Sequence, residues 1–236
     1  MNSILRYIFF TAIIISATLV SAKSPEKKIT IERPDMEQIR RDVTDPNSKY
    51  YYPKLMHQYE QNETIMTLQD YRHLYLGMLF QEDFNPYRKS ERSEEIEKLY
   101  YKQNHTRVEL DSIISYAEHA LKDDPFDFQQ INFLIFALQK RQKHNRAAIW
   151  QYRLNHLLEA IVSTGTGLDT DNAWFVINPK HEYNILNFQN VVADSQQYVE
   201  PYFDYIAVKQ ASEKSPQGYY FNIRYILEEY YRKFSE

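Results

Sequence analysis

The sequence predicts an α+β protein, in which stacked helical hairpins are followed by a small antiparallel sheet with a covering helix. Three observations carry this prediction. Apolar residues recur at helical spacing between residues 34 and 163, with short breaks at proline, aspartate and asparagine. Two of the four glycines, Gly165 and Gly167, then stand close together. After them the pattern changes to short runs of β-branched and aromatic residues, which is typical of strands.

The first 22 residues have the pattern of a secretory signal peptide. Arg6 precedes an almost unbroken apolar run at 7–20, and Val20-Ser21-Ala22 offers compact residues to a signal peptidase. A membrane-spanning helix usually needs about 20 apolar residues, so we expect cleavage after Ala22 rather than a permanent anchor. The sequence therefore predicts a periplasmic or secreted protein that meets a membrane only through the uncleaved signal segment.

Composition excludes several classes of function. Acidic residues outnumber basic ones, 32 to 28, and no basic stripe is present, so a nucleic-acid partner is not expected. The chain has no cysteine, which excludes disulfides, thiolate metal sites and a lipid-anchored N-terminus. Hydrophobic residues make up 43% of the chain, which is enough for a real core. The mature chain must therefore fold on its core alone.

The predicted helices follow one another with short connections. They lie at 34–43, 49–59, 68–81 and 94–102, and three more lie between 109 and 161. Thr67, with Asp70 three residues later, is an N-cap signal for the 68–81 helix. The 128–138 helix is apolar almost all round, so we expect it to be buried between its neighbours.

Paired helices with short loops are the pattern of a tetratricopeptide-like array. Ala117, Ala120 and Pro125 fit the end of one such repeat. The tryptophan and Leu-Gly positions of the next helix hold other residues, and no clean period of about 34 residues is visible, so a generic helical bundle stays open as the alternative. We expect a signal peptide at 1–22, a helical repeat-like region at 23–163 and a small α+β region at 164–236.

The small α+β region begins with a buried strand at 174–177 and a short helix at 181–188. The 202–209 run has no clearly solvated face, so it should be a central strand. Residues 219–223 should pair with it antiparallel. The last helix, 224–234, should cover the sheet with one apolar face, made of Ile226, Leu227, Tyr230, Tyr231 and Phe234.

Five segments carry a resemblance to a known family. They read STGTGLDTDNAWFVINPKHEYNIL at 163–186, DYIAV at 204–208, GYYFNI at 218–223, YYYPKLMHQYEQ at 50–61 and DYRHLYLGMLFQEDFNPY at 70–87. Together they resemble the bacterial family catalogued as domain of unknown function 4919, over nearly the whole mature chain. The family turn often has Gly-Asp-Gly where this chain has Gly165-Thr166-Gly167. The resemblance implies an exported protein of unassigned function and brings no catalytic residues with it.

Motifs for metal and phosphate chemistry are missing from the sequence. Asp169-Thr170-Asp171 could begin a calcium loop, but the required glycine and glutamate positions hold Trp174 and Lys180. The histidines show no metal-ligand spacing, and Gly165-Thr166-Gly167 lacks the Gly-Lys-Ser/Thr of a phosphate loop. We therefore expect no metal and no cofactor.

The trio His181-Glu182-Tyr183 is the most suggestive catalytic candidate, since it follows a strand and combines an imidazole, a carboxyl and a phenol. On base rates, however, such a trio is more often a polar cluster at a helix start. The 21 tyrosines are a second signal, because tyrosine is enriched at binding surfaces, although such rings also fill contacts between helices. Candidate binding residues from both signals are Tyr71, Tyr75, Trp174, His181, Glu182 and Tyr183.

The sequence favours a non-catalytic module whose helical array offers a concave face to a protein or peptide partner. This interpretation rests on the helical-hairpin pattern and on the lack of a strong catalytic motif. Two alternatives stay open. One is a hydrolase-type enzyme, which requires His181 and Glu182 to face one cavity. The other is a glycan-binding protein that uses exposed tyrosines.

Overall fold

The computed structural model describes residues 29–88, 93–100, 102–209, 212 and 215–234. The predicted signal peptide lies outside these residues. Within them the fold class is α+β, as the sequence predicts. The elements are α1 (Met36–Thr44), α2 (Tyr52–Glu60), α3 (Leu68–Gly77), η1 (Met78–Phe80), α4 (Ser93–Tyr100), α5 (Arg107–Asp123), α6 (Phe128–Lys140), α7 (His144–Val162), β1 (Trp174–Phe175), α8 (Lys180–Phe188), β2 (Ala193–Val199), β3 (Phe203–Val208), β4 (Gly218–Asn222) and α9 (Arg224–Phe234).

Local sequence signals set several helix starts. The predicted cap of α3 is confirmed, because Thr67 and Asp70 form a capping box in which each side chain accepts from the other's backbone N–H. Thr106 and Glu109 repeat this arrangement at α5. The side chain of Asp127 caps α6 by accepting from the backbone N–H of Gln130. These caps satisfy amides that no helix can pair internally.

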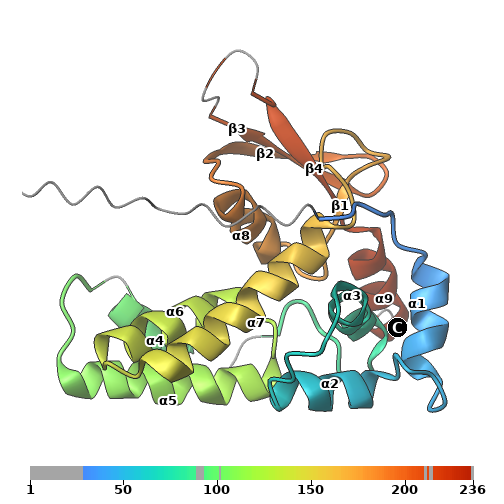
Figure 1. Cartoon of the computed structure of the whole chain (residues 1–236). Helices are drawn as coiled ribbons and strands as arrows, with labels where there is room; N and C mark the ends of the chain where they lie inside the picture. The colour runs from blue at the N-terminus through green and yellow to red at the C-terminus, as the bar shows by residue number, and fades with distance from the viewer. Residues whose placement is uncertain (1–28, 89–92, 101, 210–211, 213–214, 235–236) are drawn as a thin grey trace, which may run out of the picture.

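The helices form two groups that α7 connects to the sheet. Figure 1 shows α4 to α7 at the lower left, α1, α3 and α9 at the lower right, and the strands at the top. Helix α6 packs against both α5 and α7, as its apolar surface predicts, and α7 also contacts α3, α8 and β1. One continuous hydrophobic core joins the two groups and the sheet, with members such as Leu74, Leu134 and Phe221. No helix within the described ranges is both long and apolar enough to cross a lipid bilayer.

The four strands of the sheet have the order β1-β4-β3-β2. Strand β3 is central and pairs antiparallel with β4, as predicted. Strand β1 pairs parallel with β4, so the sheet is mixed rather than wholly antiparallel. Strand β2 was not predicted, because its residues are polar and mostly exposed. An edge strand of this kind is held by its ladder with β3, and it carries no apolar pattern of its own.

The glycine-rich turn connects α7 to the sheet. Gly167 has a φ of +71°, a conformation that only glycine adopts without strain. Its N–H donates to the Asn172 carbonyl at 2.7 Å, and its carbonyl accepts from the Tyr220 N–H at 2.7 Å. A Cβ on Gly165 would stand 2.2 Å from the Asn172 carbonyl oxygen. The turn therefore depends on glycine at both positions.

The last helix buries a different face from the one that its apolar residues suggest. Ile226 and Glu229 are its buried residues, whereas Tyr231 and Phe234 are 60% and 49% exposed. The Glu229 carboxylate is paired with Arg40 of α1 and, at 2.7 Å, with Arg232. Helix α9 contacts η1 as well. The ion pair between Glu229 and Arg40 of α1 thus orients α9, and apolar periodicity does not predict this contact.

Candidate functional site

The predicted trio stands at the start of α8, and its three side chains diverge. Successive residues of an α-helix point about 100° apart. His181 and Glu182 are buried, with 3% and 0% of their surface exposed, whereas Tyr183 is 45% exposed. Each of the three side chains therefore has different neighbours.

His181 is a buried core residue that contacts several other elements. Its Nδ1 accepts from the Tyr75 hydroxyl at 2.7 Å, and that hydroxyl in turn accepts from the Ile177 N–H at 3.2 Å. The imidazole stacks on Phe128, with 4.1 Å between ring centroids. Burial lowers the pKa of His181 to about 3, although a hydrogen bond to the Phe126 backbone opposes this shift. The ring is therefore neutral, and both of its nitrogens have partners.

Glu182 faces the sheet, away from His181. Burial raises its pKa to about 9, and the charge of Asp204 on β3 and a hydrogen bond to that residue add to the shift. Its Oε2 accepts from Gln196 Nε2 at 3.4 Å, whereas Oε1 has no partner while the group is a carboxylate. Protonation at neutral pH makes Glu182 a donor toward Asp204. The two groups form a carboxyl–carboxylate pair.

The hydrolase-type alternative required His181 and Glu182 to face one cavity, and the structure does not bring them together. His181 borders a cavity of about 20 Å³, between η1, the 83–88 loop and Asn178. That volume suffices for roughly one water molecule. Glu182 does not line this cavity. The arrangement offers no shared space for a substrate.

The remaining predicted binding residues also lie in the core. Tyr71 is 2% exposed and packs against His156 at 5.0 Å between ring centroids. Trp174 is 4% exposed, and its indole N–H donates to the Gly165 carbonyl at 2.9 Å. Tyr75 is fully buried. Of the six candidate residues, only Tyr183 presents its side chain to solvent.

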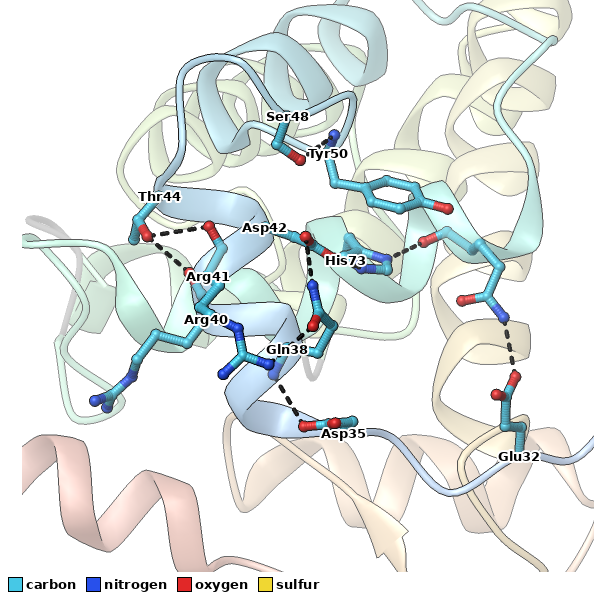
Figure 2. A network of polar contacts seen from close by, with 11 residues as sticks. Glu32, Asp35, Gln38, Arg40, Arg41, Asp42, Thr44, Ser48, Tyr50 and His73 are labelled. Atoms are coloured by element: carbon cyan, nitrogen blue, oxygen red, sulfur yellow. Dashed lines mark hydrogen bonds and ion pairs between the residues drawn. The ribbon is translucent and has the colours of Figure 1, made fainter.

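A second histidine takes part in a polar network between α1 and α3 (Figure 2). His73 Nε2 lies 3.2 Å from the Asp42 carboxylate, and its Nδ1 lies 2.8 Å from the Gln69 carbonyl. The ring stacks on Tyr50 at 3.7 Å. Because both nitrogens face acceptors, His73 has no free nitrogen for proton transfer. The network holds the two helices together.

The described part of the chain does not meet the requirements of a metal site. Among the residues that the structure describes, no group of three His, Asp or Glu side chains is placed to hold a metal ion. The Asp169 carboxylate accepts from the Asn172 backbone N–H at 2.8 Å and from its side-chain amide. Asp169 therefore shapes a polar turn.

A groove with a volume of about 900 Å³ lies between α2, α5 and α7. Ligand sites commonly have about 300–1,000 Å³. Five basic and three acidic side chains line this groove, which we call the basic groove. The basic side chains are Lys122, Arg141, Lys143, Arg146 and Arg153, and the acidic ones are Glu60, Asp111 and Glu118. The groove is thus net positive, in a chain whose net charge is −4.

Two of the five cations are already paired. Arg141 Nε lies 2.7 Å from the Asp111 carboxylate, and Arg146 pairs with Glu118. Lys122, Lys143 and Arg153 have no carboxylate partner among the described residues. The unpaired positive charge is the electrostatic feature of the basic groove.

Arg153 stands out in this set, because only 9% of its surface is exposed. Its guanidinium lies 4.6 Å from the ring centroid of Trp150 and 4.9 Å from that of Tyr59. Nη2 donates to the Glu60 carbonyl at 2.8 Å, whereas Nε and the Tyr59 hydroxyl are buried without partners. A guanidinium has five N–H donors. Two aromatic rings and one carbonyl therefore hold the guanidinium of Arg153, and no carboxylate among the described residues pairs with it.

Sequence reasoning missed this groove. Its lining comes from three helices whose order in space the sequence does not reveal. One local signal existed, because Arg146, Trp150 and Arg153 share one face of α7 at spacings of four and three. The sequence prediction rested instead on the 21 tyrosines, and its candidates Tyr71 and Tyr75 are core residues.

A family model described as Domain of unknown function (DUF4919) matches residues 37–232. No curated protein and no solved structure matches the chain. The match covers every described helix and strand in whole or nearly so.

Proposed function

The chain belongs to the family described as Domain of unknown function (DUF4919), and from this premise and the geometry above we propose that it is a non-catalytic interaction module. The basic groove between α2, α5 and α7 is the binding surface. Its ligand is an extended, acidic segment of another protein. The observation that carries the proposal is the largely buried guanidinium of Arg153, which lies beside Trp150 and has no carboxylate partner among the described residues.

The arrangement of the helices supports this proposal. Helices α5, α6 and α7 are consecutive, and α6 packs against both of the others. The basic groove is lined by α5 and α7, the alternate members of the series, together with α2. Tetratricopeptide-like arrays bind partners on the surface made by alternate helices. We accordingly interpret 109–161 as repeat-like.

Charge supports the acidic character of the partner. A carboxylate can form paired hydrogen bonds with a guanidinium, and these are stronger than bonds between neutral groups. Arg153 Nη1 has no hydrogen-bond partner among the described residues and is not fully buried, so it is open to the groove. Lys122 and Lys143 add unpaired positive charge nearby. Trp150 supplies an apolar surface for the side chains between the acids.

Two labelled dodecapeptides of opposite charge test the proposal by fluorescence anisotropy. One repeats Glu-Ala-Tyr and the other repeats Lys-Ala-Tyr. We expect the acidic peptide to bind and the basic one not to bind. Raising the salt from about 50 to about 300 mM should weaken binding, because it shortens the range of charge interactions.

Two sets of substitutions test whether the acidic peptide binds in the basic groove. Arg153→Gln should weaken binding of the acidic peptide about tenfold, which corresponds to about 1.4 kcal/mol. The double variant Lys122→Glu, Lys143→Glu tests the same surface without touching a buried residue. Arg224→Gln is the control, because this exposed residue on α9 lies outside the groove and pairs with Glu228. Equal binding of both peptides, or binding that neither groove variant weakens, would refute the proposal.

Export and bacterial origin are further parts of the proposal. The support is the apolar run at 7–20 followed by Val20-Ser21-Ala22. We propose a periplasmic or secreted location, with a helical region to residue 163 and an α+β region after it. N-terminal sequencing of the full-length chain expressed in a Gram-negative host should find Lys23 first, in the periplasm or the medium. An intact N-terminus in the membrane fraction would contradict this location.

A further inference from the structure

Two adjoining hollows run along the exposed side of α6, and neither shares a lining residue with the basic groove. One has a volume of about 400 Å³ and lies between α6, α8 and β2. The other has about 360 Å³ and lies between α6, α5 and the residues that follow α4. Asn132 and Phe133 line both hollows, so the two are neighbours on one surface. We call this surface the amide groove.

Amide side chains dominate the polar lining of the amide groove. They are Gln103, Gln129, Asn132, Asn184 and Gln196. Each amide carries both donors and acceptors and no charge. Among the described residues, no aspartate or glutamate lines either hollow. This chemistry matches a ligand that is rich in hydroxyl groups and uncharged.

Aromatic rings supply the apolar part of the lining. Tyr183 is 45% exposed, and Phe133 and Phe136 are half-buried. Phe133 stacks on Tyr100, with 3.4 Å between ring centroids, so its position is fixed. An exposed ring that cannot swing away presents a flat face on which the C–H face of a sugar ring can pack.

A chain of hydrogen bonds fixes Tyr183. The Tyr183 hydroxyl donates to Gln196 Oε1 at 2.9 Å, and Gln196 Nε2 donates to Glu182 Oε2 at 3.4 Å. Glu182 in turn is buried beside Asp204. The chain runs from the core to the surface through α8, β2 and β3. Its exposed end is the phenol ring that borders the amide groove.

We propose that the amide groove binds a neutral glycan, with Tyr183 as a stacking platform and Asn132, Asn184 and Gln129 as hydroxyl-binding groups. A peptide with charged side chains fits less well, because only Lys102, Lys180 and His105 could meet a charge there. An acidic glycan would lack the arginine pairs that recognise carboxylates. This site is independent of the proposed function of the basic groove.

Isothermal titration calorimetry with purified full-length mature protein tests this proposal. The probes are the hexasaccharides of cellulose, xylan, mannan and amylose, with hexagalacturonate as the acidic counterpart. We expect at least one neutral hexasaccharide to bind with a dissociation constant of about 1 mM or tighter. Tighter binding of hexagalacturonate than of any neutral probe would overturn the proposal, as would the absence of binding by all four neutral probes.

Three variants assign the binding to the amide groove. Tyr183→Ala should weaken binding of the neutral hexasaccharide about tenfold or more. Gln196→Ala should weaken it less, because the ring remains but is no longer held. Tyr231→Ala is the matched control, since this tyrosine is 60% exposed on α9 and lies outside the groove. Unchanged affinity in Tyr183→Ala, with an unchanged melting temperature, would overturn the proposal. Binding of the acidic dodecapeptide should be unaffected by Tyr183→Ala, which separates this site from the basic groove.

Discussion

Replacing Glu182 by glutamine should make the protein more stable at neutral pH. The substitution keeps the shape of the side chain and provides an N–H donor toward Asp204, as the protonated acid does. It removes the need to hold a proton on a buried carboxyl group. Glu182 has no exposed surface, and burial is the main reason why its pKa is raised to about 9.

The size of the effect follows from proton linkage. The ordinary pKa of the group is 4.5, so between pH 4.5 and about 9 the folded chain binds one proton more than the unfolded chain. The contribution of Glu182 to stability is therefore fully present below pH 4.5 and is lost as the pH rises toward about 9. At pH 7 the loss is about 3 kcal/mol, since each pKa unit corresponds to about 1.4 kcal/mol.

Urea unfolding followed by circular dichroism measures this effect. The wild type and Glu182→Gln should have similar free energies of unfolding near pH 4.5, and the difference should grow to about 3 kcal/mol at pH 7 in favour of the variant. Subtracting one free energy of unfolding from the other removes the contributions of the titrating groups that both chains share. Glu82→Gln, at an exposed position, should leave the pH profile unchanged. Parallel wild-type and Glu182→Gln profiles between pH 5 and 8 would refute the reasoning.

Two further substitutions test how α9 and the glycine turn are held. Glu229→Gln should lower the free energy of unfolding by about 1–3 kcal/mol, because this buried carboxylate meets both Arg40 and Arg232. Glu228→Gln should cost under about 1 kcal/mol, since its pair with Arg224 is exposed, and equal costs in the two variants would contradict the assignment. Gly165→Ala should destabilise by about 2 kcal/mol or more, because its Cβ would meet the Asn172 carbonyl oxygen at 2.2 Å. Thr166→Ala, in the same turn, serves as its control in a thermal melt, and a melting temperature of Gly165→Ala equal to that of the wild type would show that the turn adapts.

The two proposed surfaces differ in the kind of ligand that they favour. The basic groove concentrates charge in a chain that is acidic as a whole, so it should attract acidic partners over a distance of about 8–10 Å in physiological salt. The amide groove is lined mainly by uncharged groups and should act only at contact. Separate surfaces on one scaffold would allow a glycan and a protein to be bound together.

The tyrosine-rich composition illustrates why composition does not identify a binding surface. Tyr71 and Tyr75 are among the largest fully buried side chains of the protein. Tyr75 satisfies its hydroxyl inside the core with Ile177 and His181. A tyrosine whose hydroxyl has a buried partner can fill a core as phenylalanine does. Packing decides which rings are exposed, and among the six candidate residues it leaves only Tyr183 exposed.

Local sequence determined much of the architecture. Apolar periodicity, the capping residue Thr67 and the glycine turn act over a few residues, so they predicted the helices, the central β3 strand and the change from helix to sheet. The tertiary structure alone decided the rest. In the folded chain, the polar strand β2 pairs with β3, and the ion pair of Glu229 with Arg40 orients α9. His181 and Glu182 face different neighbours, and Arg153 has no carboxylate partner among the described residues. Each of these outcomes depends on partners distant in the chain, such as Arg40 and Asp204, and the burial and charge that they create arise only when the helices and the sheet pack together.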